Sequence, residues 1–279
     1  MQLLVADSAG FCFGVTRAIK MACAAARRYP HQIYSLGPLI HNPQEVERLK
    51  EVGVRVAEDL DKVKEGTVIF RSHGVTMEEA NQARERGLKI VDATCPFVKK
   101  AQKYASSLSR GGYLVVIVGD KGHPEVHGIL SYIKGKWLVT ESAQGLKALS
   151  GVKKLGVIAQ TTQSYKNFQD VVFQTLLVAR EVTAFNTICD ATRIRQQESV
   201  KLAQGVETMI VIGGYNSANT TRLANLCRQV QPSTHHVETE RELDASWFKG
   251  VQRVGITAGA STPSWLIERV REEVAKIAS

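Results

Sequence analysis

The sequence lacks the features of a membrane-bound or secreted protein. It has no run of eighteen consecutive apolar residues, the minimum expected of a membrane-spanning helix. The N-terminal segment MQLLVADSAGFCFGV has no basic region followed by an uninterrupted apolar run, as a secretory signal would have. We therefore expect a cytoplasmic protein that does not associate with a membrane.

Cysteine is also scarce, and its scarcity excludes a disulfide framework. Five cysteines in 279 residues are an odd number and too few to hold a fold together. The sequence has no C-x-x-C pair either, although zinc ribbons and ferredoxin-type sites use closely spaced cysteines. The cysteines are therefore expected to be free thiols or widely separated metal ligands.

The common nucleotide-binding patterns are missing as well. No G-x-G-x-x-G follows a predicted strand and the P-loop pattern is absent, so nicotinamide and ATP binding have no support. Aromatic residues make up only 6%, and the lysines and arginines are scattered rather than gathered into a tail or stripe. The net charge of +9 therefore does not predict nucleic-acid binding, and it would equally attract an anionic metabolite or an acidic electron-carrier protein.

What the sequence does contain is a regular alternation of short apolar runs and amphipathic stretches. The apolar runs end in glycine or polar clusters, and the stretches between them have the length and periodicity of helices. This pattern predicts an α/β fold. Strands are predicted at 33–36, 67–71, 113–118, 155–159, 209–212 and 252–257, and helices at 14–28, 43–52, 77–86, 97–110, 164–179, 191–204, 218–229 and 263–277.

Three cysteines occupy similar junctions between a predicted strand and a predicted helix. Cys12 ends LLVADSAGFC, Cys95 ends LKIVDATC and Cys189 ends FNTIC, and successive members are 83 and 94 positions apart. This spacing predicts three α/β units over residues 1–95, 96–189 and 190–279, although the strand within 1–12 could pair with either end of the chain. Because ligands of parallel sheets lie beyond the carboxyl ends of strands, units facing a common centre would share one site.

The position of these cysteines favours metal binding. A helix N-terminus stabilises a thiolate, and three thiolates could hold zinc with one open position or a 4Fe-4S cluster with one iron lacking a protein ligand. Ligands that lie so far apart in the chain favour a cluster buried between units. Cys23 and Cys227 instead lie in apolar helical stretches and are predicted to fill the core.

Polar side chains at the other strand ends predict an anion site. Imidazole, hydroxyl and amide groups suit a phosphate or diphosphate, and two of them stand where a predicted helix begins. The residues in this set are His41, His73, His123, Ser217, Asn219 and Ser261. The histidines at positions 31, 127, 235 and 236 are predicted to be surface or structural residues.

Glu125, in GHPEVHG, is the one carboxylate inside a strand-end motif. Beside a reduced cluster and a diphosphate the pKa of Glu125 should rise, which would make it a proton donor near neutral pH. Thr161, in AQTT, is placed to relay this proton through its hydroxyl.

A series of short motifs carries a resemblance to a known family. The motifs are GFCFGV, HN, SHGV, DATCP, GHPEV, QTT, NTICDAT with RQ soon after, NSAN and TAGAS, in this order over nearly the whole chain. In these motifs the chain resembles the 4-hydroxy-3-methylbut-2-enyl diphosphate reductases, the last enzymes of the non-mevalonate isoprenoid route. The resemblance implies three α/β units in a pseudo-threefold arrangement around a central cavity that holds an iron-sulfur cluster.

The resemblance also implies roles for individual residues. Cys12, Cys95 and Cys189 would bind a 4Fe-4S cluster whose unique iron binds the substrate hydroxyl, while Glu125 and Thr161 would deliver a proton. The remaining substrate contacts are implied for His41, His73, His123, Thr161, Ser217, Ala218, Asn219 and Ser261. The implied reaction removes the allylic hydroxyl with two electrons and two protons and gives isopentenyl and dimethylallyl diphosphates. An acidic carrier such as ferredoxin or flavodoxin would supply the electrons.

One phosphate motif departs from the family pattern. Its commonest form is Ser-Ser-Asn, whereas this chain has Ser217, Ala218 and Asn219. If the missing hydroxyl contributes a hydrogen bond, its loss would cost on the order of 1 kcal/mol of binding free energy.

Two other functions remain open at this point. A quinolinate-synthase-like enzyme would also join three α/β units around a three-cysteine site, but it would condense carboxylates without net reduction. A non-catalytic iron-sulfur sensor that binds nucleic acid would be consistent with the pI of about 9.3, and its binding would depend strongly on salt.

Overall fold

The computed structural model describes residues 1–29, 31–147 and 149–277. Within these residues the strands form three parallel sheets of four strands each, and helices pack against them. The predicted α/β class with three similar units is confirmed. By their contacts the residues divide into unit 1, which comprises Met1–Thr16, Ile40–Glu47 and Asp190–Ser279, and unit 2, which comprises Arg17–Leu39 and Arg48–Cys189.

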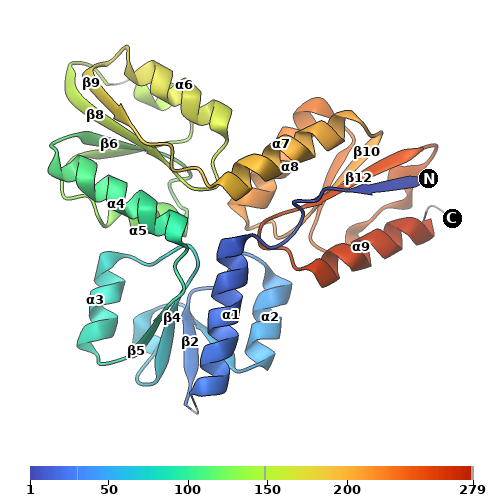
Figure 1. The fold of residues 1–279 in the computed structure, drawn as a ribbon, viewed down its shortest axis with the longest axis horizontal. Helices are drawn as coiled ribbons and strands as arrows, with labels where there is room; N and C mark the ends of the chain where they lie inside the picture. Colours follow the sequence, from blue (N-terminus) through green and yellow to red (C-terminus); the bar gives the residue numbers. More distant parts are fainter. Residues whose placement is uncertain (30, 148, 278–279) are drawn as a thin grey trace. The chain divides into compact units, whose positions relative to one another are not determined.

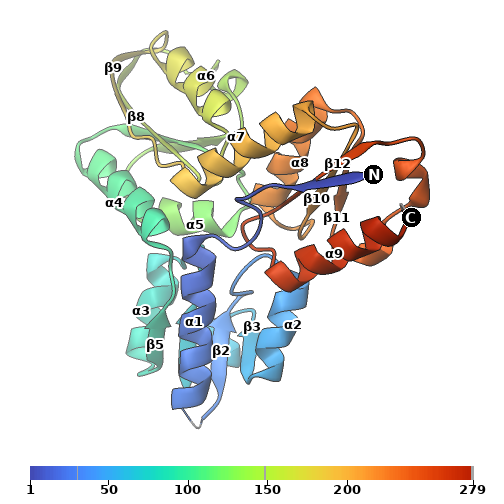
Figure 2. The same ribbon diagram turned by 45° about the vertical axis from the view of Figure 1, so that its right-hand side comes forward.

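Unit 1 contains one sheet, and the first strand of the chain joins it. The strand order is β1 (Gln2–Val5), β12 (Arg253–Ala258), β10 (Thr208–Ile212) and β11 (Thr234–Val237). Figures 1 and 2 show β1 beside β12, in a register that pairs Gln2 with Arg253. The first strand therefore pairs with the end of the chain, which is one of the two choices that the sequence left open.

The helices of unit 1 cover both faces of this sheet. They are α7 (Asp190–Gln204), α8 (Ala218–Val230) and α9 (Ser264–Ile277), with α7 and α8 on one face and α9 on the other (Figure 1). Along β10, Ile210 packs in the α9 cluster with Val270, whereas Met209 packs in the α7 and α8 cluster with Leu223. This alternation explains why the strand is apolar from Met209 to Ile212, since both of its faces are buried.

Unit 2 contains the other two sheets. The first has the order β3 (Val54–Ala57), β2 (Ile33–Leu36), β4 (Thr67–Phe70) and β5 (Lys89–Asp92), and the second has the order β7 (Trp137–Thr140), β6 (Leu114–Val118), β8 (Val152–Ala159) and β9 (Ala179–Ala184). The remaining helices are α1 (Phe13–Arg28), α2 (Pro43–Glu51), α3 (Met77–Glu85), α4 (Pro96–Arg110), α5 (Pro124–Leu130) and α6 (Tyr165–Thr175). The residues of α1 and α2 are shared between the two units.

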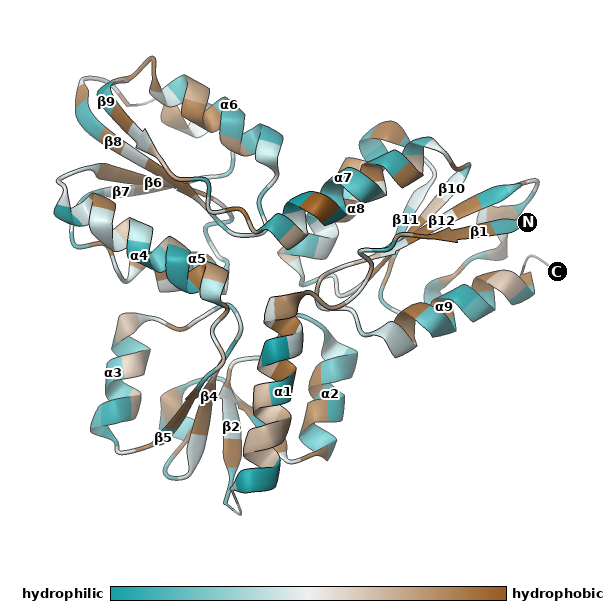
Figure 3. Ribbon diagram, viewed as in Figure 1, coloured by the Kyte–Doolittle hydropathy of each residue, from teal (hydrophilic) through white to brown (hydrophobic). Residues whose placement is uncertain are grey.

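The same two-sided burial holds in the second sheet of unit 2. Ile117 of β6 packs with Ala105 of α4, while its neighbour Val118 packs in the cluster that contains Phe168 of α6. Figure 3 shows the result as strands that are hydrophobic along much of their length and helices whose hydrophobic and hydrophilic residues alternate by face. None of the helices in the described part of the chain has the length and apolarity needed to cross a bilayer.

Local sequence explains where the structure differs from the predicted elements. The helix predicted over 164–179 ends at Thr175, and the chain turns into β9 at Ala179. The short helix α5 was not predicted. Pro124 fits its first turn and the His123 ring accepts a hydrogen bond from the Glu125 N–H, so the start signal lies in the motif that also supplies the candidate acid.

Candidate functional site

Two of the three candidate ligand cysteines lie in unit 2, each tied by its backbone to a neighbouring strand-end loop. Cys95 caps α4, and its N–H donates to the Ser72 carbonyl at 2.9 Å. Cys189 is the residue before α7, and its N–H donates to the Thr161 carbonyl at 3.0 Å. Each thiol therefore sits directly before a helix, as the sequence predicted, in a partly exposed position.

Glu125 is a buried carboxylate whose two oxygens are both held by one residue. Its side chain accepts the Thr161 N–H at 2.6 Å and the Thr161 hydroxyl at 2.7 Å. Glu125 is 1% exposed and Thr161 6% exposed, so bulk water is excluded from this contact. Because the Thr161 carbonyl also accepts from Cys189, a single residue links the candidate acid to a candidate ligand.

The two candidate histidines of unit 2, His73 and His123, lie next to each other. His123 caps α5, and its Nδ1 accepts the Glu125 N–H at 3.1 Å, so any proton on the neutral ring is at Nε2. The His73 and His123 rings meet edge to face, with 5.6 Å between centroids. The structure thus brings together, at the carboxyl ends of unit 2 strands, Cys95, His73, His123, Glu125, Thr161 and Cys189.

Unit 1 gathers the remaining candidates around the start of α8. Ser217 caps this helix: its hydroxyl accepts from the Thr220 N–H at 3.3 Å and from the Thr220 hydroxyl at 3.0 Å. Ala218 is the first helical residue and Asn219 the second. Because the free N–H groups of a helix start point outward from its first turn, this corner of unit 1 favours an anion.

His41 and Ser261 lie in loops that meet at the same corner. The Ser261 hydroxyl donates to the His41 carbonyl at 3.0 Å. A Cβ on Gly214 would lie 2.9 Å from that carbonyl oxygen, so only glycine lets the loop after β10 come so close to His41. Three strand-end loops of unit 1 therefore converge on one place.

Two buried amide groups in this corner have no protein acceptor. The Nδ2 atoms of Asn219 and Asn42 lack a hydrogen-bond partner among the described residues, although the two side chains are only 6% and 1% exposed. An unsatisfied buried donor is costly, so an acceptor such as a phosphate oxygen fits these positions. Asn42 was not singled out in the sequence analysis, where the HN motif drew attention to His41 alone.

Cys12, the third candidate ligand, belongs to unit 1. Its N–H donates to the Ala260 carbonyl at 3.1 Å, and α1 begins at the next residue. In the described part of the chain, no group of three or more His, Cys, Asp or Glu side chains is arranged to hold a metal ion. The donor set itself suits a soft metal centre, since thiolate sulfur is a soft ligand and all three cysteines are partly exposed.

Of the two remaining cysteines, Cys227 lies in the core as predicted, whereas Cys23 on α1 is only partly buried. Cys227 is completely buried, and burial raises the pKa of its thiol to about 12. His235 stacks on Trp247 with ring centroids 3.8 Å apart. His236 donates from Nε2 to the Gly213 carbonyl at 2.8 Å, which braces the loop leading to Ser217.

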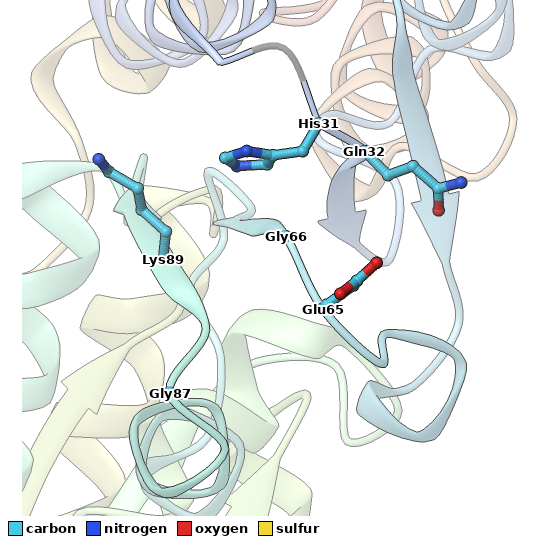
Figure 4. Close-up of a pocket in the computed structure, with 6 residues that line it drawn as sticks. All are labelled: His31, Gln32, Glu65, Gly66, Gly87 and Lys89. Carbon is cyan, nitrogen blue, oxygen red and sulfur yellow. The ribbon is translucent and has the colours of Figure 1, made fainter.

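Two surface depressions of unit 2 lie outside these contacts. One, of about 490 Å³, is lined by residues at the starts of β2, β4 and β5, among them His31, Glu65 and Lys89 (Figure 4). It lies at the amino ends of these strands, whereas the candidate residues lie at the carboxyl ends. Ligands of parallel sheets bind beyond the carboxyl ends, so this depression is not a candidate functional site.

The other depression is a groove of about 330 Å³ that reaches Thr94, the neighbour of Cys95. Its charged lining includes Arg84, Lys103 and Lys99, whose ammonium lies 2.6 Å from Asp92. Burial alone would raise the pKa of Asp92, but hydrogen bonds from Lys99 and Thr94 hold it below its usual value. We call this feature the basic groove.

Comparison with known proteins decides the family. A family model described as LytB protein matches residues 3–275. The chain belongs to the LytB family. LytB relatives named 4-hydroxy-3-methylbut-2-enyl diphosphate reductase are 54% identical in Geobacter metallireducens, over 100% of this chain and 99% of the relative, and 55% identical in Geobacter sulfurreducens, over 98% and 97%. The resemblance predicted from the motifs is confirmed.

Solved structures agree with this LytB assignment. One is titled as the structure of (E)-4-hydroxy-3-methyl-but-2-enyl diphosphate reductase, the terminal enzyme of the non-mevalonate pathway; it is 46% identical, with a TM-score of 0.73 over 99% of this chain and 100% of the other. Another, an E-1-hydroxy-2-methyl-but-2-enyl-4-diphosphate reductase from Plasmodium falciparum, is 26% identical, with a TM-score of 0.92 over 97% and 87%.

Proposed function

We propose that this protein is a 4-hydroxy-3-methylbut-2-enyl diphosphate reductase, which removes the allylic hydroxyl of its substrate to give isopentenyl and dimethylallyl diphosphates. The reaction consumes two electrons and two protons and releases water. The observation that carries the proposal is the buried Glu125 and Thr161 pair, joined to Cys189 within one unit of a LytB-family chain.

The proposal assigns Cys12, Cys95 and Cys189 as the ligands of a 4Fe-4S cluster. When bound, the cluster would supply the electrons and an iron that accepts the substrate hydroxyl. The residues fit this role because each thiol precedes a helix whose N-terminal dipole stabilises a thiolate. Three protein ligands leave one iron of a four-iron cluster open.

The diphosphate would be held by donors from strand-end loops. Ser217 and the Asn219 amide offer it the start of α8, with the His41 loop beside them. His73 and His123 supply imidazole donors from unit 2. Ala218 has no hydroxyl to contribute, so the proposal assigns it only a backbone N–H at the helix start.

Glu125 would protonate the departing hydroxyl. The Thr161 hydroxyl, 2.7 Å from a carboxyl oxygen of Glu125, is the group through which a proton would pass. The resulting water leaves, and the carbon skeleton takes the second proton.

We propose an acidic one-electron carrier protein, such as ferredoxin or flavodoxin, as the donor, and the basic groove as the place where it docks. Charge complementarity supports this choice. Unit 2 has 25 Lys and Arg against 14 Asp and Glu, a net charge of +11, whereas unit 1 has 11 against 13, a net charge of −2. The groove brings this positive surface to the neighbour of Cys95, and electron transfer requires a short path.

An anaerobic assay tests the function. Cluster-loaded protein reduced by dithionite and methyl viologen should consume 4-hydroxy-3-methylbut-2-enyl diphosphate and form both products, as followed by mass spectrometry. A fully loaded sample that leaves the substrate intact would refute the proposal. Carboxylate condensation without net reduction would point instead to quinolinate-synthase-like chemistry, and salt-dependent binding of nucleic acid without turnover to a sensor.

A further inference from the structure

The loop between β1 and Cys12 is held by two charged residues of α7. The Glu198 carboxylate accepts the Asp7 N–H at 2.6 Å with one oxygen and the Ser8 N–H at 2.9 Å with the other. The Arg195 guanidinium donates twice to the Ser8 carbonyl, at 3.0 and 2.5 Å, and once to the Gly10 carbonyl at 2.6 Å. Side chains one helical turn apart therefore hold four backbone groups of a single loop.

Holding the loop in this way requires burial of a charged side chain, which costs free energy that apolar packing between a helix and a strand would not. Arg195 is only 3% exposed, and burying a guanidinium is costly, so its hydrogen bonds to the Ser8 and Gly10 carbonyls offset part of that cost. The planar fork of arginine can address two carbonyls at once, which a lysine ammonium cannot do with the same geometry. Burial alone would raise the pKa of Glu198, but hydrogen bonds from Ser8 and Asp7 and the charge of Arg195 hold it below its usual value.

The loop has a conformation that needs such support. Gly10 has a φ of +101°, and a Cβ there would lie 3.2 Å from Ile267 and 3.4 Å from the Thr262 carbonyl oxygen. Cys12 follows two residues later, so the direction in which the chain leaves Gly10 sets the position of its thiol.

We propose that Arg195 and Glu198 are positioning residues that fix the thiol of Cys12 for metal binding. Both residues are on α7, which begins at Asp190, directly after Cys189. They therefore also connect the Cys12 loop to the helix that follows Cys189, a second proposed ligand. This inference rests on the proposed function, because the position of the Cys12 thiol matters for metal binding only if Cys12 is a ligand.

The test measures the reactivity of each cysteine in the full-length chain after the cluster has been removed. The variants are Arg195→Lys, Arg195→Gln and Glu198→Gln, and alkylation by iodoacetamide is followed for each thiol by peptide mass spectrometry. Arg193→Gln is the matched control, because Arg193 is on the same helix but its side chain is 43% exposed and near Asp190. Cys227, which is completely buried, reports global unfolding in the same sample.

We expect alkylation of Cys12 to change by roughly tenfold in Arg195→Gln, since hydrogen bonds to a charged group are lost, and by less in Arg195→Lys. Cys95, Cys189 and Cys227 should react as in the parent chain, as should all five thiols in the Arg193→Gln control. Unchanged Cys12 reactivity in Arg195→Gln would overturn the inference. A parallel rise at Cys227 would also overturn it, because the residue would then act on the stability of the whole unit.

A second measurement keeps the inference separate from the proposed function. In Glu198→Gln, hydrogen exchange at the amides of Asp7 and Ser8 should accelerate, and the loaded protein should release iron to a chelator faster than the Arg193→Gln control. If Cys12 reactivity changes as expected while iron content does not depend on Cys12, the loop is held as inferred but the ligand assignment fails. If exchange at Asp7 and Ser8 is unchanged, the inference itself fails.

Discussion

At the scale of single residues, the chemistry depends on carboxylate and thiol groups whose backbones are tied to neighbouring loops. Glu125 does not reach into open solvent: both oxygens are engaged by Thr161, and its own N–H is capped by His123. A group held in this way keeps its geometry when a substrate binds. In the proposed mechanism, Glu125 would therefore donate a proton without first having to be ordered.

Replacing Glu125 by glutamine should remove the proton donor while keeping the shape. We expect a folded protein with the same cluster content and turnover lowered at least about a hundredfold, following the usual contribution of general acids. Anaerobic turnover with a chemical reductant, beside iron content and thermal unfolding, measures this. Glu141→Gln, an exposed carboxylate of the same unit, is the control. Near-normal turnover in Glu125→Gln would remove the residue from the mechanism.

Replacing Cys95 by serine should abolish stable cluster binding. A serine hydroxyl is a poor ligand for iron in a thiolate site, so most of the iron and sulfide should be lost. Chemical determination of both elements, with the visible absorption of the cluster, gives the readout. Cys23→Ser, on α1, should retain them. Full iron and sulfide in Cys95→Ser would show that the cysteine is not a ligand.

At the scale of elements, helix starts and strand-end loops position the candidate residues, and neighbouring side chains brace the loops. The loop from Gly213 to Ser217 is an example. His236 donates to the Gly213 carbonyl, and its ring packs against Tyr215 at 4.7 Å between centroids. Both contacts hold the segment that presents Ser217 and Asn219 to the proposed diphosphate.

This brace predicts a dependence of stability on pH. Burial lowers the pKa of His236 from 6.5, against the opposing effects of the Gly213 carbonyl and of Glu238 and Glu242, while Arg228 also lowers it. The folded state then binds fewer protons than the unfolded state. The stability due to the neutral ring is therefore complete above about pH 6.5 and is lost as pH falls through the lowered pKa.

Urea unfolding across this pH range measures the effect. The free energy of unfolding should fall on acidification in the parent chain and fall less in His236→Gln. His127→Gln, at an exposed position of unit 2, controls for the substitution itself. Equal pH dependence in the parent chain and in His236→Gln would contradict the assignment to His236.

At the scale of the whole molecule, the charge is unevenly divided. The excess positive charge of the chain belongs to unit 2, and part of it lines the basic groove beside Thr94. Exposed charges of this kind act mainly on the rate of encounter and are screened by salt. The expected consequence is a donor-dependent step that weakens as ionic strength rises.

Charge reversal in the groove tests this directly. In Arg84→Glu with Lys103→Glu, the KM for a purified acidic flavodoxin should rise about tenfold, while turnover with a small chemical reductant stays the same. Binding of the oxidised flavodoxin, measured by calorimetry, should weaken in parallel. Lys134→Glu with Lys136→Glu is the matched control, because these residues adjoin Ser109 near the other end of α4. That end is roughly 20 Å from Cys95. Equal effects in both pairs would indicate general attraction and no defined docking place.

Much of the architecture was predictable because it is encoded locally. Buried parallel strands such as β6 are apolar at every position, and strand-to-helix junctions carry the cysteines, so the α/β class and the three repeats could be predicted. Helix α5 was missed because it has only seven residues, too few for a clear periodic pattern. The confirmed family resemblance likewise depended on short contiguous motifs.

What the sequence determined by itself is the set of chemical groups and the elements that carry them, since helix starts, strand ends and side-chain types are local properties. Only the tertiary structure decided which groups meet. Thr161 contacts Glu125 across 36 positions; the sequence predicted that both residues serve one proton, but the contact itself is tertiary. Arg195 reaches the loop before Cys12 across 187 positions, and no local pattern marks that pairing. The physical reason is that packing selects such contacts, because a buried charge or carbonyl without a hydrogen-bond partner lowers the stability of the fold.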